Sequence, residues 1–146
     1  MKLRFIFLGK KKIQSYDLLM NKYLKRLNSF VKSDFIFLNE KNNLKLEDKI
    51  FSLIKSRDCL VVLDERGIRM SSYKYSVFLN KVLSESNTIF LLIGASYGVP
   101  KDIVKKSNFI ISLSEMTLPH LIARLLLVEQ TYRSLTILNN HPYHHE

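Results

Sequence analysis

Cys59-Leu-Val-Val-Leu63-Asp-Glu-Arg-Gly67 is the stretch that decides the fold class of this 146-residue chain. Its first five residues form a continuous apolar run, which is typical of a strand that is buried on both faces. Strands of that kind belong to parallel sheets with helices on both sides. The polar residues of Asp64–Gly67 follow where such a strand should end. The stretch therefore predicts an α/β fold.

Segments with the spacing of strands and of helices alternate on either side of this run. The predicted strands are Lys2–Leu8, Asp34–Leu38, Cys59–Leu63, Thr88–Ile93 and Asn108–Leu113. The predicted helices begin near Ile13, Leu46, Ser71, Pro100 and Pro119, and the last and longest runs to about Leu138. This alternation predicts one α/β domain over residues 1–146, with a mostly parallel sheet.

Three segments should lie together beyond the carboxyl ends of the strands, where sheets of this kind bind ligands. They are Asp64–Gly67, Gly94–Gly98 and Ser112–Leu118. Each one brings polar residues or glycine to the end of an apolar run. The sequence therefore predicts a ligand site at this edge of the sheet.

The charge of the chain is strongly basic and unevenly distributed. The formal net charge is +10 and the isoelectric point is about 9.7. Residues 1–58 hold 14 Lys and Arg against 6 Asp and Glu, whereas residues 59–146 hold 9 against 7. A localised basic surface attracts polyanions such as RNA. A generally basic proteome gives the same excess without any nucleic-acid role, so the charge alone leaves both interpretations open.

Cysteine content and apolar-run lengths indicate the compartment. The single cysteine, Cys59, excludes an internal disulfide framework and fits a reducing environment. No apolar run approaches the roughly 18–20 residues that are needed to cross a bilayer. The apolar stretch Phe5–Leu8 is too short for a signal peptide, and we expect a strand there. We therefore expect a cytoplasmic protein that has no membrane partner.

The segment Gly94-Ala95-Ser96-Tyr97-Gly98 matches G-x-S-x-G, the nucleophile elbow of α/β-hydrolases. Asp102, and then His120 or His144, follow in the order of acid and histidine that this class requires. However, the chain is smaller than a hydrolase domain normally is, and no second oxyanion-hole loop such as HGGG is visible. The structural alternative is a tight turn that uses two glycines. A serine hydrolase is therefore a remote alternative function.

Polar residues near the C-terminus also have structural explanations. Glu129 and Arg133 are four residues apart on the last predicted helix, which is the spacing of an ordinary ion pair. His141, His144 and His145 crowd the tail, but their spacing matches no zinc signature. We therefore predict no metal site.

Five segments in a fixed order give this chain a family resemblance. The C-terminal third carries Leu113-Ser-Glu-Met-Thr-Leu-Pro-His120, Glu129-Gln-Thr-Tyr-Arg133 and Pro142-Tyr-His144. Upstream lie Leu63-Asp-Glu-Arg-Gly67 and Leu92-Ile-Gly-Ala-Ser-Tyr-Gly98. In order and spacing these segments resemble the ribosomal RNA large-subunit methyltransferase H family of SPOUT enzymes. The likeness covers essentially the whole chain, and residues 1–58 share mainly the pattern of strands and helices.

The resemblance implies a fold and an activity. The fold would be an α/β knot, in which the C-terminal chain threads through a loop and forms a trefoil knot. The protein would be a homodimer that methylates N3 of a pseudouridine in 23S rRNA. The methyl donor would be S-adenosyl-L-methionine, and the substrate would be the large ribosomal subunit or the assembled ribosome.

The resemblance also implies site residues. By position, the cofactor contacts would be Leu63, Gly94, Leu113, Ser114, Glu115, Met116, Thr117 and Leu118. The catalytic candidates are His144, Arg133 and Tyr143, because the family places the tail against the cofactor pocket. Histidine can accept a proton near neutral pH, whereas arginine can only stabilise negative charge or hold phosphate. His120 is a less favoured fourth candidate, and which of them acts stays open.

One position departs from the family pattern. Family members usually carry two consecutive glycines where this chain has Gly94-Ala95. The methyl group of Ala95 would crowd the cofactor or demand a different backbone angle. The alternative to an enzyme is therefore a non-catalytic relative that binds the ribosome or RNA.

Overall fold

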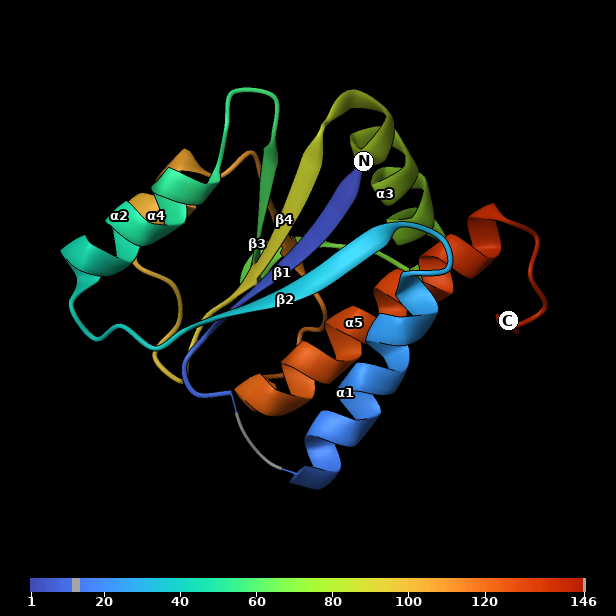
Figure 1. Cartoon of the computed structure of the whole chain (residues 1–146), viewed down its shortest axis with the longest axis horizontal. Coiled ribbons are helices and arrows are strands. Elements are labelled where there is room, and N and C mark those ends of the chain that lie inside the picture. The colour runs from blue at the N-terminus through green and yellow to red at the C-terminus, as the bar shows by residue number, and fades with distance from the viewer. Residues whose placement is uncertain (12–13, 146) are drawn as a thin grey trace.

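Five strands form the centre of the molecule in the computed structural model, which describes residues 1–11 and 14–145 (Figure 1). The strands are β1 (Lys2–Leu8), β2 (Lys32–Leu38), β3 (Cys59–Arg69), β4 (Thr88–Ile93) and β5 (Phe109–Ser112). Their order across the sheet is β2-β1-β4-β3-β5, and each neighbouring pair is parallel. The predicted α/β class with a parallel sheet is confirmed.

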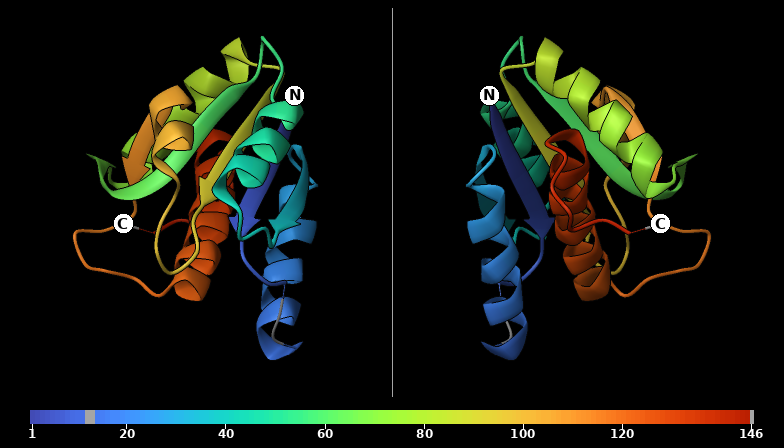
Figure 2. Two further views of the ribbon diagram at one scale, coloured as in Figure 1. Left: turned by 90° about the vertical axis from the view of Figure 1, so that its left-hand side faces the viewer. Right: turned by 90° about the vertical axis from the view of Figure 1, so that its right-hand side faces the viewer.

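Helices cover both faces of this sheet (Figure 2). They are α1 (Gln14–Leu27), α2 (Asn43–Leu53), α3 (Ser72–Glu85), α4 (Lys101–Lys106) and α5 (His120–Leu138). Helices α1, α3 and α5 pack on one face, and α2 and α4 pack on the other. The sequence predicts a helix at each of these places, although Ile13, its expected start for the first helix, lies outside the described residues.

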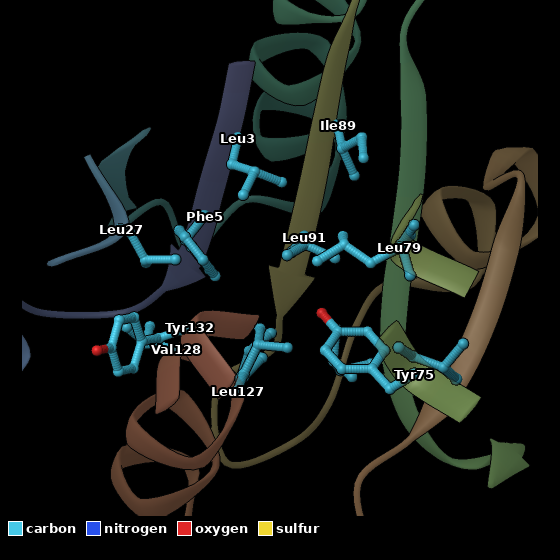
Figure 3. Close-up of a cluster of buried hydrophobic side chains, with 14 of the residues drawn as sticks. Leu3, Phe5, Leu27, Tyr75, Leu79, Ile89, Leu91, Leu127, Val128 and Tyr132 are labelled. Carbon is cyan, nitrogen blue, oxygen red and sulfur yellow. The ribbon is translucent and has the colours of Figure 1, made fainter. Parts of the chain in front are cut away.

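The larger hydrophobic core lies between the sheet and the helices α1, α3 and α5 (Figure 3). Phe5 of β1 and Leu91 of β4 are completely buried there, together with Leu79 of α3 and Leu127 of α5. A second core lies between the opposite face of the sheet and the helices α2 and α4. The segments Cys59–Leu63 of β3 and Ile89–Ile93 of β4 are therefore buried between helices on both faces, as the apolar run Cys59–Leu63 indicates.

Strand β3 is longer than the sequence predicts. We expected it to end at Leu63, but it continues through an irregularity to Arg69. Gly67 permits this extension, because a Cβ atom at this position would lie 2.7 Å from backbone atoms of β5. Asp64–Gly67 is therefore part of a strand and not a loop. It still lies beyond the pairing of β3 with β4, which stops at Leu63.

Arg124 joins α5 to the carboxyl end of β1. Its side chain is completely buried, and its two terminal nitrogens donate to the carbonyl oxygens of Leu8 and Lys10, both at 3.0 Å. The guanidinium also lies over the ring of Phe7, at 5.2 Å from the centroid. These contacts hold the first turns of α5 against the edge of the sheet where the predicted ligand segments meet.

The C-terminal end of α5 turns the tail back toward the helix. Asn140 has a φ of 55°, a left-handed conformation that asparagine tolerates better than most residues. The N–H of Asn140 donates to the carbonyl of Ile137 at 3.3 Å, and that of His141 donates to the carbonyl of Thr136 at 2.9 Å. This pair of bonds is a Schellman motif, which ends the helix and sets the direction of the tail.

Candidate active site

A hollow of about 430 Å³ opens at the carboxyl ends of β3, β4 and β5. All three segments that were predicted to meet at this edge contribute to its wall. Of the predicted cofactor contacts, those that line it are Leu63, Gly94, Leu113, Ser114, Met116, Thr117 and Leu118. Its volume falls in the range of about 300–1,000 Å³ that is usual for small-molecule sites.

The turn 94–98 forms one wall of the hollow. A Cβ atom at Gly94 would lie 2.5 Å from the carbonyl carbon of Gly98, so only glycine lets the turn close this tightly. Gly98 has a φ of 86°, and its N–H donates to the carbonyl of Ala95 at 2.9 Å. Ala95 itself has no positive φ, and its methyl group packs against the core under α2 and α4. Ala95 therefore needs no unusual backbone angle.

The loop 113–118 forms the opposite wall and stands out from the edge of the sheet (Figure 2). The hydroxyl of Ser114 accepts a hydrogen bond from the backbone N–H of Met116 at 2.9 Å, which closes a turn inside the loop. The hydroxyl of Thr117 donates to Glu65 of β3 at 3.3 Å. The loop is therefore attached to the extension of β3 and not only to its own ends.

Charged side chains at the rim have different orientations. Glu115, a predicted cofactor contact, is turned away from the hollow and forms an ion pair with Arg69. Asp64 does line the hollow, and it accepts two hydrogen bonds from the Arg66 side chain at 3.0 Å. Hydrogen bonding from Arg66 holds the pKa of the Asp64 carboxyl below its usual value. The hollow therefore presents an ionised carboxylate at neutral pH.

The three catalytic candidates gather near the other end of α5. Glu129 accepts hydrogen bonds from Arg133 at 2.6 and 3.0 Å, which confirms the predicted ion pair, and from the Tyr143 hydroxyl at 3.0 Å. Arg133 Nη1 lies 3.0 Å from Nδ1 of His144. The Tyr143 ring packs edge-on against Tyr132, with 4.7 Å between the centroids. The tail is therefore docked on the helix by several side chains.

We call Glu129, Arg133, Tyr143 and His144 the tail cluster. Helix α1 also contacts it. The hydroxyl of Tyr23 lies 3.3 Å from that of Tyr143. Sequence reasoning missed this partner, which is 120 residues away along the chain. For Glu129 the sequence predicted only an ion pair, and not that the same carboxylate anchors the tail.

The protonation chemistry of the tail cluster follows from its contacts. Burial, followed by hydrogen bonding with Tyr23 and Glu129, raises the pKa of Tyr143, so this phenol stays protonated at neutral pH. A guanidinium can only donate, so Nδ1 of His144 accepts from Arg133, and a neutral ring carries its hydrogen on Nε2. The cluster thus offers N–H donors from Arg133 and His144, while Glu129 balances the charge of Arg133 and accepts the hydroxyl of Tyr143.

The hollow and the tail cluster lie apart within one chain. His120, the first residue of α5, lines the hollow, whereas Arg133 follows thirteen residues later on the same helix. At ~1.5 Å per residue, the two positions are about 20 Å apart along the axis. Figure 1 shows the tail that follows α5 beyond the far end of this helix. A single chain therefore does not bring the predicted catalytic and cofactor residues together.

The hydrolase alternative finds no support in this geometry. Ser96 is exposed on the turn, and His120 lines the same hollow. Asp102 lies instead at a separate hollow beside α4. Within residues 1–11 and 14–145, no hydrogen bond joins Ser96 to either of them. The expected order of serine, acid and histidine therefore does not become a catalytic triad.

The described residues hold neither a cluster of metal ligands nor a membrane-spanning helix. In the part of the chain that the structure describes, no three His, Cys, Asp or Glu side chains are grouped so that they could hold a metal ion. His141 instead packs edge-on against Phe30, with 6.5 Å between the ring centroids. None of the described helices has the length and apolar character that a bilayer span requires.

Comparisons with known proteins agree with this geometry. A family described as "Predicted SPOUT methyltransferase" matches residues 1–144. The Ribosomal RNA large subunit methyltransferase H of Flavobacterium psychrophilum is 37% identical over 157 residues, which cover 100% of both chains. A probable methyltransferase from Bordetella pertussis Tohama I has a similar fold, with a TM-score of 0.60 at 9% identity over 91% of this chain and 93% of that one.

The SpoU methyltransferase AviRb from Streptomyces viridochromogenes, solved in complex with the cofactor AdoMet, has a TM-score of 0.51. It is 11% identical, and the match covers 89% of this chain and 56% of that one. Identities this low show a shared fold alone. The family match and the full-length relative show more, and from them we conclude that the chain belongs to the SPOUT methyltransferase family.

Proposed function

We propose that this protein transfers a methyl group from S-adenosylmethionine to N3 of a pseudouridine in the 23S rRNA of the large ribosomal subunit, in the cytoplasm. The observation that carries this proposal is the hollow at the carboxyl edge of the sheet, lined by the extension of β3, the turn 94–98 and the loop 113–118. The name of the full-length relative and the net charge of +10 support an RNA substrate. We expect the trefoil knot of the family as well.

The residues of the hollow fit S-adenosylmethionine. Leu63, Leu113 and Leu118 offer apolar surface for a purine ring, and the backbone of the loop 113–118 offers polar groups for its edge. Asp64 and Arg66, an ion pair on the same lining, offer a carboxylate and a guanidinium to the charged groups of such a ligand. When bound, this cofactor supplies a methyl group that is already activated on a sulfonium. The protein therefore needs no covalent intermediate, and its task is alignment and the control of one proton.

The tail cluster supplies what the acceptor nitrogen needs. Neutral pseudouridine carries a hydrogen on N3, and this nitrogen becomes nucleophilic only when the proton leaves. A nearby positive charge lowers the pKa of such a group, and N–H donors stabilise the anion that forms. Arg133 and a neutral His144 provide N–H donors, Glu129 balances the charge of Arg133, and the Tyr143 hydroxyl donates to Glu129 and so positions the cluster. Because Nδ1 of His144 accepts from Arg133, we favour stabilisation of the N3 anion over abstraction of the N3 proton by His144.

We further propose a homodimer in which the tail of one chain completes the hollow of the other. Within one chain the two parts lie about 20 Å apart along α5. Apolar side chains on the adjacent helices α1 and α5 also face solvent, since Leu18 is 75% exposed and Ile122 is 50% exposed. Exposed apolar surface of this kind marks protein interfaces. A two-fold dimer buries the same surface on both chains.

Mass spectrometry of rRNA nucleosides tests the proposed reaction. Ribosomes that lack the modification are incubated with the purified protein and a donor that carries a deuterated methyl group. We expect the label in a methylpseudouridine from 23S rRNA and in no other nucleoside. Label in a different nucleoside, or in none, would contradict the proposed reaction.

Calorimetry separates the enzyme from the non-catalytic alternative. Because Ala95 has an ordinary backbone angle, we expect S-adenosylmethionine to bind. Ribosome binding without any cofactor binding would favour the non-catalytic relative.

A further inference from the structure

Arg26, in the last turn of α1, lies beside the tail cluster. Its guanidinium carbon is 5.6 Å from the ring centroid of Tyr23 and 5.7 Å from that of Tyr132. Both rings contact Tyr143, Tyr132 through an edge-on packing at 4.7 Å and Tyr23 through the hydroxyl contact at 3.3 Å. A single aromatic side chain therefore separates Arg26 from a catalytic candidate.

Arg26 differs from Arg133 in its partners. Arg133 is held by the carboxylate of Glu129. Within the described residues, the guanidinium of Arg26 has neither a carboxylate nor a carbonyl as hydrogen-bond partner. Stacking on rings uses the faces of a guanidinium and leaves its N–H edges available. On the same helix, Lys22 and Lys25 are exposed and likewise have no ion-pair partner in the described chain.

A cation held by two rings and not neutralised by a carboxylate is suited to an anion from outside the protein. Its planar fork matches the paired oxygens of a phosphate group. We propose that Arg26 binds a phosphodiester of the RNA next to the target nucleotide and so positions that nucleotide against Arg133 and His144. This inference rests on the proposed function for the identity of the ligand. Lys22 and Lys25 add attraction along the same backbone.

The structural alternative is that Arg26 only stabilises α1. A basic residue in the last turn of a helix interacts favourably with the helix dipole, and the contacts with Tyr23 and Tyr132 add packing. That role predicts a loss of thermal stability without any change in how RNA affinity depends on salt. A phosphate contact predicts that RNA affinity depends less on salt once Arg26 is replaced, because each neutralised phosphate releases counterions.

The test compares Arg26→Gln and Arg26→Lys with Arg57→Gln, a matched control. Arg57 is exposed in the connection between α2 and β3, at the amino edge of the sheet and away from the site. The affinity of a fluorescein-labelled RNA stem-loop containing pseudouridine is measured by anisotropy over a series of KCl concentrations. We expect Arg26→Gln to weaken binding about tenfold and to reduce the salt slope by about one.

Arg26→Lys should keep the salt slope but bind RNA more weakly than the wild type, because it keeps the charge and loses the fork. Arg57→Gln should match the wild type. Equal affinity and salt slope for Arg26→Gln and Arg57→Gln would overturn the inference. Should Arg26→Gln fail to fold, wild-type affinity in Arg26→Lys would overturn it instead. Binding is read without methyl transfer, so a wild type that binds RNA through Arg26 but transfers no methyl group contradicts only the proposed function.

Discussion

Glu129 accepts hydrogen bonds from two of the three catalytic candidates, Arg133 and Tyr143. Its other carboxylate oxygen accepts from the amide of Gln130 at 2.8 Å, and Gln130 accepts from the Ser72 hydroxyl at 2.6 Å. One carboxylate therefore connects α3, α5 and the tail. The direction in which Arg133 projects depends on this anchor.

Replacing Glu129 by Gln tests this positioning role. The variant keeps the size of the side chain and removes the charge that holds Arg133 and Tyr143, so we expect unfolding free energy to fall by about 1–3 kcal/mol. Turnover should fall as well, whereas the affinity for S-adenosylmethionine should not change, because the hollow lies at the other end of α5. Thermal denaturation, methyl transfer and calorimetry measure the three quantities. Full turnover in this variant would show that catalysis does not need the anchor.

Gly94→Val tests the cofactor site. A Cβ atom at Gly94 would lie 2.5 Å from the Gly98 backbone, so the turn 94–98 must shift and deform the hollow. We expect calorimetry to detect no S-adenosylmethionine binding, with thermal unfolding showing that the chain still folds. The matched control is Ala95→Gly, which removes a methyl group without a change of backbone region and should bind nearly as the wild type does. Unchanged affinity in Gly94→Val would place the cofactor elsewhere.

At the scale of the elements, local patterns predict most of the fold. The apolar run Thr88–Ile93 is observed as β4 with the same limits, and α5 begins after Pro119 and ends at Leu138 as expected. The end of β3 could not be predicted in this way. It depends on the close approach of Gly67 to β5, a contact between residues more than forty positions apart.

For the candidate site, too, the sequence predicts which segments come together but not how their side chains are arranged. The rule that ligands bind beyond parallel strands brings together the segments that line the hollow. It does not give side-chain directions, and Glu115 is turned toward Arg69. The docking of the tail depends on Tyr23, and the packing of α5 on the end of β1 depends on Arg124, which is buried through contacts over 114 and 116 residues. Neither arrangement can be predicted from a pattern of neighbouring residues, because the contacts join residues far apart in the sequence.

Removing the tail tests the role of that element. Deletion of residues 142–146 removes Tyr143 and His144, so we expect it to spare S-adenosylmethionine binding and to abolish methyl transfer. A general base at His144 would make His144→Ala lower turnover by about 10²-fold or more; because Nδ1 of His144 accepts from Arg133, we expect a smaller loss, with Arg133 stabilising the anion. Single-turnover assays with ribosomes measure both effects. A truncated chain with the normal rate would remove the tail from the mechanism.

At the scale of the whole molecule, assembly decides whether the hollow and the tail cluster can meet. Light scattering should give about twice the chain mass of 17.1 kDa. Leu18→Glu combined with Ile122→Glu places charge on the exposed apolar surface of α1 and α5, and should give a folded monomer without methyl transfer. Val77→Glu changes a residue of α3 that is 53% exposed and should leave the dimer intact. A monomeric wild type with full activity would contradict the shared site.

Mixed dimers test most directly whether each active site is built from two chains. One chain lacks residues 142–146, and the other carries Thr117→Trp, which fills the hollow from an exposed loop. Each homodimer should be inactive. A mixed dimer, purified through two different tags, combines one intact hollow with one intact tail, so we expect about half of the wild-type rate of rRNA methylation. Mixed dimers as inactive as both parents would show that hollow and tail act within the same chain.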